Sequence, residues 1–186
     1  MAGLPQLVTE RLVLRIPAPH DADRIVRFLG DEEIVRWLAR VPWPYPRSAA
    51  EEWVVGAAVA AANGDDFAFA IHAPLLEQGL LGVVTARAMG EAPTLGFWLG
   101  KPYWGRGIMT EAVGAVLCWL FDQRGVKTVQ SGAFEGNEPS MAIQTRFGFV
   151  GNGTSMVRSE HAGGDRLHLD TVLTRDAFIA ARQPGS

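Results

Sequence analysis

The chain is poor in cysteine, in tyrosine and in positive charge. Its 186 residues include one cysteine and two tyrosines, and the 17 lysines and arginines are outnumbered by 20 aspartates and glutamates. The single cysteine, Cys118, lies in the apolar run from Val116 to Phe121, so we expect a small buried hydrophobe and not a nucleophile or ligand. A disulfide framework is therefore excluded, and the sequence predicts no metal site.

Long apolar runs and basic blocks are also absent. No stretch approaches the ~20 apolar residues of a membrane-spanning helix, and no apolar signal segment opens the chain. The net charge is −3, and no lysine or arginine block supplies the usual footprint of a nucleic-acid-binding protein. We therefore expect a cytoplasmic protein that binds neither nucleic acid nor membrane and whose partner is a neutral or cationic small group.

The composition is typical of one globular domain, which we expect to span residues 1–186. Hydrophobic residues make up 48% of the chain and charged residues 20%. Glycine and proline are scattered and do not form a linker, and no internal repeat divides the chain. A chain of this length buries roughly 70% of its unfolded surface, which is enough for a core without disulfides or a structural metal.

The spacing of apolar residues predicts an α+β fold with a mixed, mostly antiparallel sheet. After a strand at 12–16 we expect helices at 20–29, 31–38 and 48–62, the last capped by Ser48 with Glu51 in a capping box. Three strands follow at 67–72, 80–88 and 94–99, and their short connections predict an antiparallel meander. The remaining predicted elements are a helix at 107–121, a strand at 128–134, a helix at 138–147 and strands at 149–157 and 167–173.

The glycine-rich stretch from Leu99 to Ala112 is the most informative segment, because a strand ends there and an apolar helix begins. No Ser, Thr, Asp or Asn stands between Gly100 and Gly107 to cap that helix with its side chain. The first amides therefore stay free, and the helix dipole adds partial positive charge, so an anion such as a phosphate is favoured there. Thr110 adds a hydroxyl donor, and Arg106 adds a positive charge.

Two common phosphate motifs do not match this stretch. A Walker motif needs Ser or Thr after Gly-Lys, and a dinucleotide-binding motif needs a third Gly or Ala where this chain has Thr110. Taken alone, the two glycines are also compatible with a plain turn before a helix.

A second segment, Asn137-Glu138-Pro139-Ser140, connects a predicted strand to a predicted helix. A structural role explains it well, because Asn137 suits an N-cap, Pro139 suits a first helical turn and Gly148 suits the helix end. The segment alone does not separate that role from a catalytic one.

Together, the two segments resemble the GNAT acetyltransferase superfamily and, within it, the Rim-type branch of ribosomal-protein N-terminal acetyltransferases. The resemblance extends from Thr9–Arg15, which looks like the opening strand of that branch, to a closing strand at 169–173. It implies a GNAT fold, with a central sheet of about seven strands flanked by helices. It also implies an N-acetyltransferase that uses acetyl-CoA to modify a primary amine, either a protein N-terminal α-amine or a small molecule, and it leaves a homodimer open.

The resemblance also implies which residues hold the acetyl donor. The implied cofactor-binding residues are Phe97, Trp98, Leu99, Gly105, Arg106, Gly107, Ile108, Met109, Thr110 and Asn137. A backbone amide near Trp98 or Leu99 is the implied oxyanion donor. Ser140 is the implied catalytic residue, as the proton donor to the leaving thiolate, with a purely structural hydroxyl as the alternative. Tyrosine has that role in much of the superfamily, but neither Tyr45 nor Tyr103 lies at the matching position.

The chain departs from the family pattern at two positions. Pro102 replaces an Arg or Gln, so one pyrophosphate contact is lost or is supplied by Lys101 or Arg106. Thr94 stands where many relatives carry an acidic residue, and the general base is left unidentified. Water-linked bases remain open at His72, His20, Glu33 and Glu135, but a surface-charge role explains each of them, and we assign none as catalytic.

Aromatic residues concentrate in the segment where this family builds its acceptor-side wall. Trp37, Trp43 and Tyr45 are the candidate substrate-binding residues, and core packing is the alternative for them and for Trp53. The missing acidic residue at Thr94 also keeps a different class open, a non-catalytic acyl-CoA-binding module. A detoxifying or amino-acid acetyltransferase is the alternative with the same fold.

Overall fold

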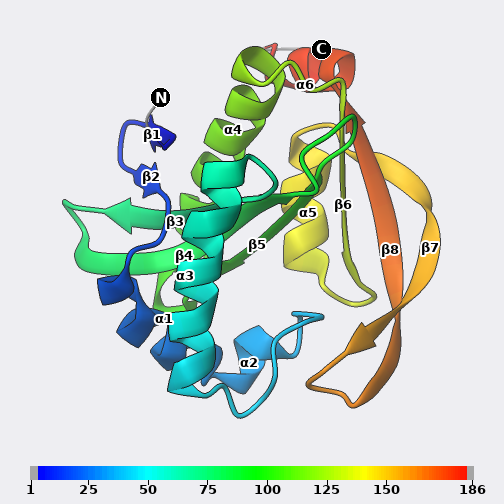
Figure 1. Cartoon of the computed structure of the whole chain (residues 1–186). Coiled ribbons are helices and arrows are strands. Elements are labelled where there is room, and N and C mark those ends of the chain that lie inside the picture. The colour runs from blue at the N-terminus through cyan, green and yellow to red at the C-terminus, as the bar shows by residue number, and fades with distance from the viewer. Residues whose placement is uncertain (1–3, 184–186) are drawn as a thin grey trace.

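An eight-stranded sheet with the strand order β1-β2-β3-β4-β5-β6-β8-β7 runs through the molecule (Figure 1). The computed structural model describes residues 4–183. All neighbouring strands are antiparallel except β5 and β6, which run parallel. The predicted α+β fold, with a mixed and mostly antiparallel sheet, is therefore confirmed.

The elements have the following bounds. The strands are β1 (Gln6–Val8), β2 (Val13–Arg15), β3 (Phe67–Ala73), β4 (Glu77–Arg87), β5 (Thr94–Leu99), β6 (Thr128–Phe134), β7 (Val150–Ser159) and β8 (Gly164–Thr174). The helices are α1 (Ala22–Leu29), α2 (Glu32–Val35), α3 (Arg47–Asn63), α4 (Ile108–Cys118), α5 (Glu138–Arg146) and α6 (Arg175–Arg182). Short 3₁₀ turns at Pro19–Asp21 and Lys101–Tyr103 precede α1 and α4, and a π-helical turn at Trp119–Gln123 continues α4.

Two helical layers cover the sheet. The first layer holds α1 and α3, which contact each other as well as β4 and β3, and α3 crosses in front of the sheet in Figure 1. The second holds α4, α5 and α6, joined by aromatic contacts of Phe178 in α6 with Phe121 and Phe147. Because both faces are covered, the central strands read as nearly continuous apolar runs, and Phe69, Ile71, Val83 and Val84 are fully buried.

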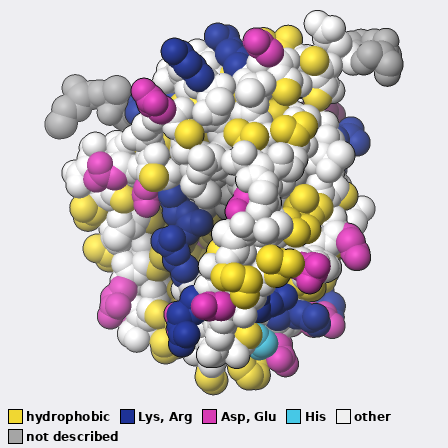
Figure 2. Space-filling view, turned by 90° about the vertical axis from the view of Figure 1, so that its right-hand side faces the viewer, with side chains coloured by type: hydrophobic (Ala, Val, Ile, Leu, Met, Phe, Trp, Pro, Cys, Tyr) yellow, Lys and Arg dark blue, Asp and Glu magenta, His cyan; other side chains and the backbone are white. Residues whose placement is uncertain are grey.

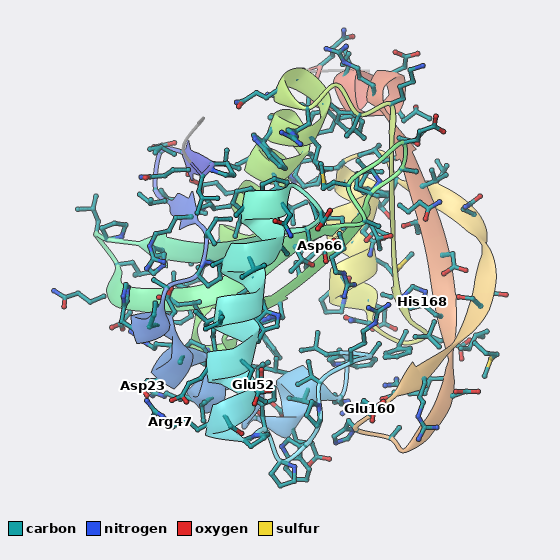
Figure 3. The ribbon with its side chains drawn as sticks, in the orientation of Figure 1. Asp23, Arg47, Glu52, Asp66, Glu160 and His168 are labelled. Atoms are coloured by element: carbon teal, nitrogen blue, oxygen red, sulfur yellow. The ribbon has the colours of Figure 1, made fainter. Side chains whose placement is uncertain are left out.

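The start of α3 differs from its sequence-based prediction. Pro46 is the N-cap residue, its extended backbone leads directly into Arg47, and no side chain caps the helix. Ser48 therefore lies inside the first turn, and the predicted capping box with Glu51 is wrong. Glu51 instead accepts a hydrogen bond of 2.8 Å from Arg47 Nε, an i,i+4 pair, and Arg47 also pairs with Asp23 of α1 (Figure 3).

The meander of β3, β4 and β5, strand β6 and helix α5 lie where the sequence predicts them, within a few residues. Strand β1 and helix α6 were not predicted, and α2 ends at Val35, three residues earlier than expected. Residues 1–3 and 184–186 of the predicted domain lie outside the described residues. Among residues 4–183, no helix has the length and apolar character needed to cross a membrane.

Cys118, at the end of α4, is partly buried and packs against the core, so the expected small buried hydrophobe is less enclosed than the sequence predicts. The thiol packs at the edge of the core, and Arg182 of α6 donates a hydrogen bond of 3.1 Å to its Sγ atom.

Candidate active site

A cavity of about 640 Å³ opens where the parallel strands β5 and β6 separate. The two strands share one ladder position, Thr94 with Gln130. One residue further along, the Ser131 hydroxyl donates to the Leu95 carbonyl at 3.0 Å, and beyond that point the strands diverge. Where two parallel strands are not joined by ladder hydrogen bonds, backbone N–H and C=O groups on both strands lack a partner. These groups can bond to an extended ligand that lies between the strands.

The backbone of β5 presents its alternate amides to this opening. Gly100 N–H donates to the Leu81 carbonyl of β4 at 2.8 Å, and antiparallel ladders bond at every second residue. The Trp98 amide therefore also points toward β4, whereas the amides of Phe97 and Leu99 point toward β6 and the opening. Of the two positions implied for an oxyanion donor, the structure places the Leu99 amide at the opening and the Trp98 amide in the ladder with β4.

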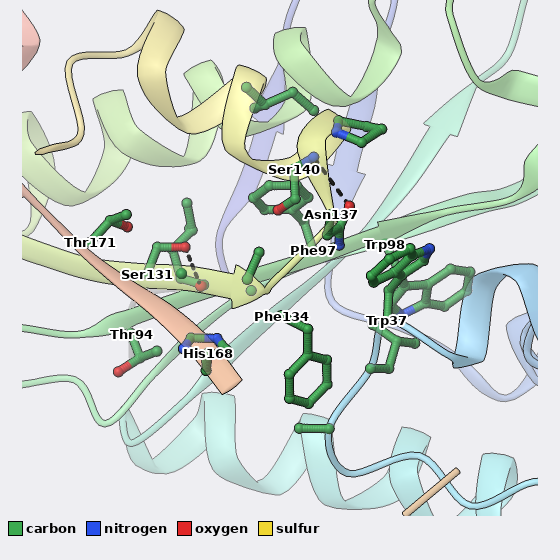
Figure 4. A pocket seen from close by; sticks show the side chains of 18 of the residues that line it. Trp37, Thr94, Phe97, Trp98, Ser131, Phe134, Asn137, Ser140, His168 and Thr171 are labelled. Atoms are coloured by element: carbon green, nitrogen blue, oxygen red, sulfur yellow. Dashed lines mark hydrogen bonds between the residues drawn. The ribbon is translucent and has the colours of Figure 1, made fainter. Parts of the chain in front are cut away.

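Side chains from both faces of the sheet line the cavity. On the face covered by α1, the lining includes Thr94, Trp98, Phe134, His168 and Asp170; on the face covered by α5, it includes Phe97, Ser131, Asn137, Ser140 and Thr171 (Figure 4). We call these two parts the α1 side and the α5 side. A small group bound at the centre of the opening is therefore reachable from two directions.

The glycine turn, Gly105-Arg106-Gly107, leads into α4 beside the cavity, and of the residues from Gly105 to Thr110 Met109 alone is part of the cavity lining. Gly105 and Gly107 have positive φ angles of 71° and 72°, and Gly107 is the N-cap of α4, with no side chain bonded to the helix end. Ile108 and Met109 are 3% and 5% exposed, so their side chains pack in the core. A ligand at the helix start would therefore bond to their backbone amides. Free amides, a helix dipole and an open space beside Gly105 fit a phosphate group.

Arg11 lies beside the glycine turn and was not among the predicted residues. Its guanidinium forms an ion pair of 2.6 Å with Glu111 and donates to the Arg106 carbonyl at 3.3 Å. Burial opposes ionisation of Glu111, but hydrogen bonds from Thr9 and Arg11 outweigh it and lower the pKa of that carboxyl. The turn between β1 and β2 thus holds the first turn of α4 through Glu111, whose carboxylate offsets the charge of Arg11.

The two residues suggested as replacements for the Pro102 contact have different surroundings. Lys101 forms an ion pair with Glu33, on the side of α2. Arg106 is exposed and lines a smaller cavity together with Arg24 and Arg27. Of these two replacements, Arg106 is the one that belongs to the glycine turn, where its carbonyl accepts from Arg11.

A hydrogen-bonded chain orients Ser140. Thr171 donates to Gln144 Oε1 at 2.6 Å, and Gln144 Nε2 donates to Ser140 Oγ at 3.2 Å. Gln144 is 1% exposed and also donates to the Gly132 carbonyl at 3.2 Å, so its amide orientation is fixed. Because Ser140 Oγ accepts from Gln144, its own proton remains available to a group in the cavity.

Asn137 is the N-cap of α5. Its side-chain oxygen accepts from the Ser140 amide at 3.4 Å, and its side chain lines the cavity (Figure 4). The structural role foreseen for Asn137 is therefore real, and it coexists with a position at the cavity wall. The cap also holds Ser140 in the first turn of the helix, where its hydroxyl faces the opening.

One of the three candidate substrate-binding aromatics lines the cavity. Trp37 lies on the α1 side, with the Arg166 guanidinium stacked 5.4 Å from the centre of its ring. Trp43 is 44% exposed and contacts His161 edge to face, outside the lining. Tyr45 packs against the core, where burial raises the pKa of its hydroxyl. A substrate contact stays a prediction for all three.

Arg166 of β8 packs against two aromatic residues of the α1 side. Its guanidinium lies 4.3 Å from the Phe134 ring centre, stacks on Trp37 and donates to the Arg36 carbonyl. The β7–β8 hairpin is further joined to the α2 segment by a hydrogen bond of 3.0 Å from the Glu160 amide to the Ala39 carbonyl. Two segments far apart in sequence thus form one wall.

On the face that carries β7 and β8, charges of both signs are mixed with apolar side chains (Figure 2).

The four side chains considered as water-linked bases do not line the cavity. His20 and His72 surround the buried Asp21, which receives a hydrogen bond of 2.8 Å from Arg15. Burial opposes ionisation of Asp21, but the Arg15 and Ala18 hydrogen bonds outweigh it and lower the pKa of that carboxyl. Burial, then the charge of Arg15, lowers the pKa of His72. Glu33 pairs with Lys101, and Glu135 is exposed.

A splayed parallel strand pair, an uncapped glycine turn and a serine at a helix start define an acyltransferase that holds an extended phosphate-bearing acyl donor. The chain belongs to the GNAT acetyltransferase family, because the family model "Acetyltransferase (GNAT) domain" matches residues 11–150. It is therefore an acyl-CoA-dependent N-acetyltransferase whose donor is acetyl-CoA, as the resemblance implied.

Relatives and solved structures agree with the Rim-type branch. YdaF of Bacillus subtilis (strain 168), provisionally named a ribosomal N-acetyltransferase, is 26% identical over 155 residues, or 78% of this chain and 81% of YdaF. RimJ of Mycobacterium smegmatis, solved in complex with CoA-disulfide, has a TM-score of 0.82 at 20% identity and covers 98% of this chain and 91% of its own. The ribosomal-protein-S5-alanine acetyltransferase of Vibrio fischeri has a TM-score of 0.80 at 19% identity, covering 92% and 97%.

Proposed function

We propose that the chain acetylates the free α-amine at the N-terminus of a protein or peptide by direct attack on acetyl-CoA within a ternary complex. The observation that carries this proposal is the cavity lined from both faces of the sheet. Ser140 lies on the α5 side and Trp37 on the α1 side, with Arg166 stacked on the Trp37 ring. A donor held on the first side leaves the second side open to an acceptor.

The chain's residues supply positioning and polar stabilisation for this transfer. Acetyl-CoA brings a thioester carbonyl that an amine can attack. The amides of the glycine turn hold the phosphates, the Phe97 and Leu99 amides face the arm of the donor, and the Leu99 amide is a donor for negative charge on the carbonyl oxygen. Ser140, oriented by Gln144, gives its proton to the departing sulfur.

Chemistry and relatives both favour an α-amine as the acceptor. The pKa of a free α-amine is about 7.7 to 8.0 against about 10.4 for lysine, so far more of it is neutral at physiological pH. The names of YdaF and of the S5-alanine enzyme refer to ribosomal-protein acetylation. The N-terminus of a ribosomal protein is accordingly the first acceptor to try.

A panel of acceptors tests the proposal. We expect acetyl-CoA, but not ATP or NAD at equal concentration, to raise the thermal midpoint, because only acetyl-CoA reaches both the glycine turn and the Asn137 segment. We expect mass spectrometry to show acetylation of peptide α-amines in preference to polyamines, free amino acids and aminoglycosides. Stabilisation by acetyl-CoA without transfer to any amine would indicate a binding module instead, and transfer to small amines alone would indicate a small-molecule enzyme.

A further inference from the structure

A histidine and an aspartate form a hydrogen-bonded pair in the cavity wall. His168 Nδ1 lies 2.7 Å from Asp170 Oδ1, and Ser155 of β7 donates to the same carboxylate oxygen at 3.0 Å. His168 and Asp170 both line the cavity at positions two residues apart on β8, so their side chains share one face of the sheet. Neither residue was singled out from the sequence.

The pair lies on the α1 side of the opening, where the proposed function places the acceptor. His168 is directly opposite Phe134 of β6, and Asp170 is opposite Gly132. By the alternation of β6, these positions share a face with Gln130 and therefore with Thr94, its ladder partner. Gly132 carries no side chain, which leaves room for the imidazole, because a Cβ atom there would lie 2.4 Å from His168 Cε1.

The pair is suited to accept a proton. Asp170 accepts from Nδ1–H, which leaves the lone pair of Nε2 free, and no described residue forms a hydrogen bond with Nε2. Thr94, at the position where many relatives have an acidic residue, has a hydroxyl that does not act as a base at neutral pH. His168 thus presents a ring nitrogen with a free lone pair on the α1 side of the cavity.

We propose that His168 is the general base that takes the proton from the acceptor amine, and that Asp170 positions it. This assignment rests on the proposed function. The amine lone pair forms the N–C bond, and the C–S bond breaks with its electron pair passing to sulfur. The amine proton moves to His168 Nε2, while Ser140, on the opposite side of the sheet, gives its proton to sulfur. Proton exchange through solvent then returns both side chains to their starting states.

Several charged groups lie on the same side of the cavity as His168. Asp170 and Arg166 lie on its own strand and face, and Arg87 of β4 lines the same cavity, with Arg40 and Asp66 nearby. Burial and the charge of Arg40 lower the pKa of Arg87. The other neighbours carry no charge. They are Gln130, Gly132 and Phe134 of β6, Ser155 of β7, and the lining residues Trp37, Leu38 and Ala39. The charged side chains on this side thus include Asp170, Arg166 and Arg87, with Arg40 and Asp66 acting on Arg87.

The test compares His168→Gln with the unaltered chain and with His20→Gln, a change at an exposed histidine outside the cavity. We expect kcat/KM for the acceptor to fall roughly a hundredfold or more in His168→Gln, with the affinity for acetyl-CoA unchanged. On the acid side, kcat/KM should rise more steeply with pH in the unaltered chain and in His20→Gln, where the acceptor amine and the general base must both be deprotonated, than in His168→Gln, where only the acceptor amine must be. In Asp170→Asn, kcat should fall while the KM for acetyl-CoA stays constant.

The outcomes separate the two claims. Normal kcat/KM with an unchanged acid limb in a folded His168→Gln variant would overturn this assignment and leave the proposed function standing. Failure of the unaltered chain to acetylate any amine would overturn the proposed function and this assignment with it. Thermal unfolding of each variant, with and without acetyl-CoA, shows whether a loss of activity comes from a loss of folding.

Discussion

Gly107→Glu is expected to abolish coenzyme A binding while leaving a folded protein. A glutamate at this N-cap places a carboxylate where the free amides of α4 would meet a phosphate, so it fills the space and repels the ligand. The surroundings of Gly107 admit the side chain, since a Cβ atom there meets nothing closer than Arg11 Nη2 at 3.6 Å. We expect affinity measured by isothermal calorimetry to fall roughly a hundredfold or more.

A matched control separates this effect from backbone strain. Gly125 has a φ of 66°, close to the 72° of Gly107, and nothing lies within 4 Å of a Cβ atom at that position. Gly125→Glu therefore carries the same left-handed strain, of about 1 to 2 kcal/mol, away from the cavity. Equal loss of affinity in both variants, or normal affinity in Gly107→Glu, would contradict a phosphate site at the glycine turn.

Ser140→Ala is expected to lower kcat and kcat/KM together by roughly ten- to a thousandfold, with acetyl-CoA affinity nearly unchanged. The physical reason is that Ser140 Oγ accepts from Gln144 and keeps its own proton for the leaving sulfur. The helix start should survive, because Asn137 bonds the backbone amide of Ser140 and not its hydroxyl. Steady-state kinetics and calorimetry on the same preparation measure both quantities.

Asn137→Ala is the companion variant for Ser140→Ala. It removes the N-cap of α5 and should cost about 1 kcal/mol of unfolding free energy, and it should weaken donor binding before it slows turnover. A loss of kcat at Asn137 with none at Ser140 would reverse the assignment and make water or the acceptor the proton source. A purely structural Ser140 would instead show a loss of stability with kcat intact.

Local signals in the sequence predicted most of the fold. Strand β6 and helix α5 are bounded by clear turn residues, and the meander of β3, β4 and β5 follows from short connections between apolar runs. Strand β1 has three residues, too few for a visible period, and it exists because it pairs with β2. The start of α3 was mispredicted because the Pro46 backbone, and not a side chain, fixes the point at which the helix begins.

Some residues of the candidate site could be predicted from local sequence motifs, and others could not. The glycine turn and the Asn137 segment are local motifs, so sequence reasoning found them. Arg11 reaches the turn through contacts with a residue 100 positions away, and His168 reaches the cavity through the pairing of β8 with β6. Nothing in the local sequence indicates such contacts. Trp43 lies near Trp37 in the chain, but the loop directs it toward His161 instead of the cavity.

A crystal structure with bound coenzyme A would show whether the acyl donor occupies the opening between β5 and β6. We expect the pyrophosphate on the amides from Gly105 to Thr110, the pantetheine arm along Phe97 and Leu99, and the sulfur within hydrogen-bonding reach of the Ser140 hydroxyl. Coenzyme A bound elsewhere, or bound with its sulfur away from Ser140 and the cavity with His168, would contradict this expectation.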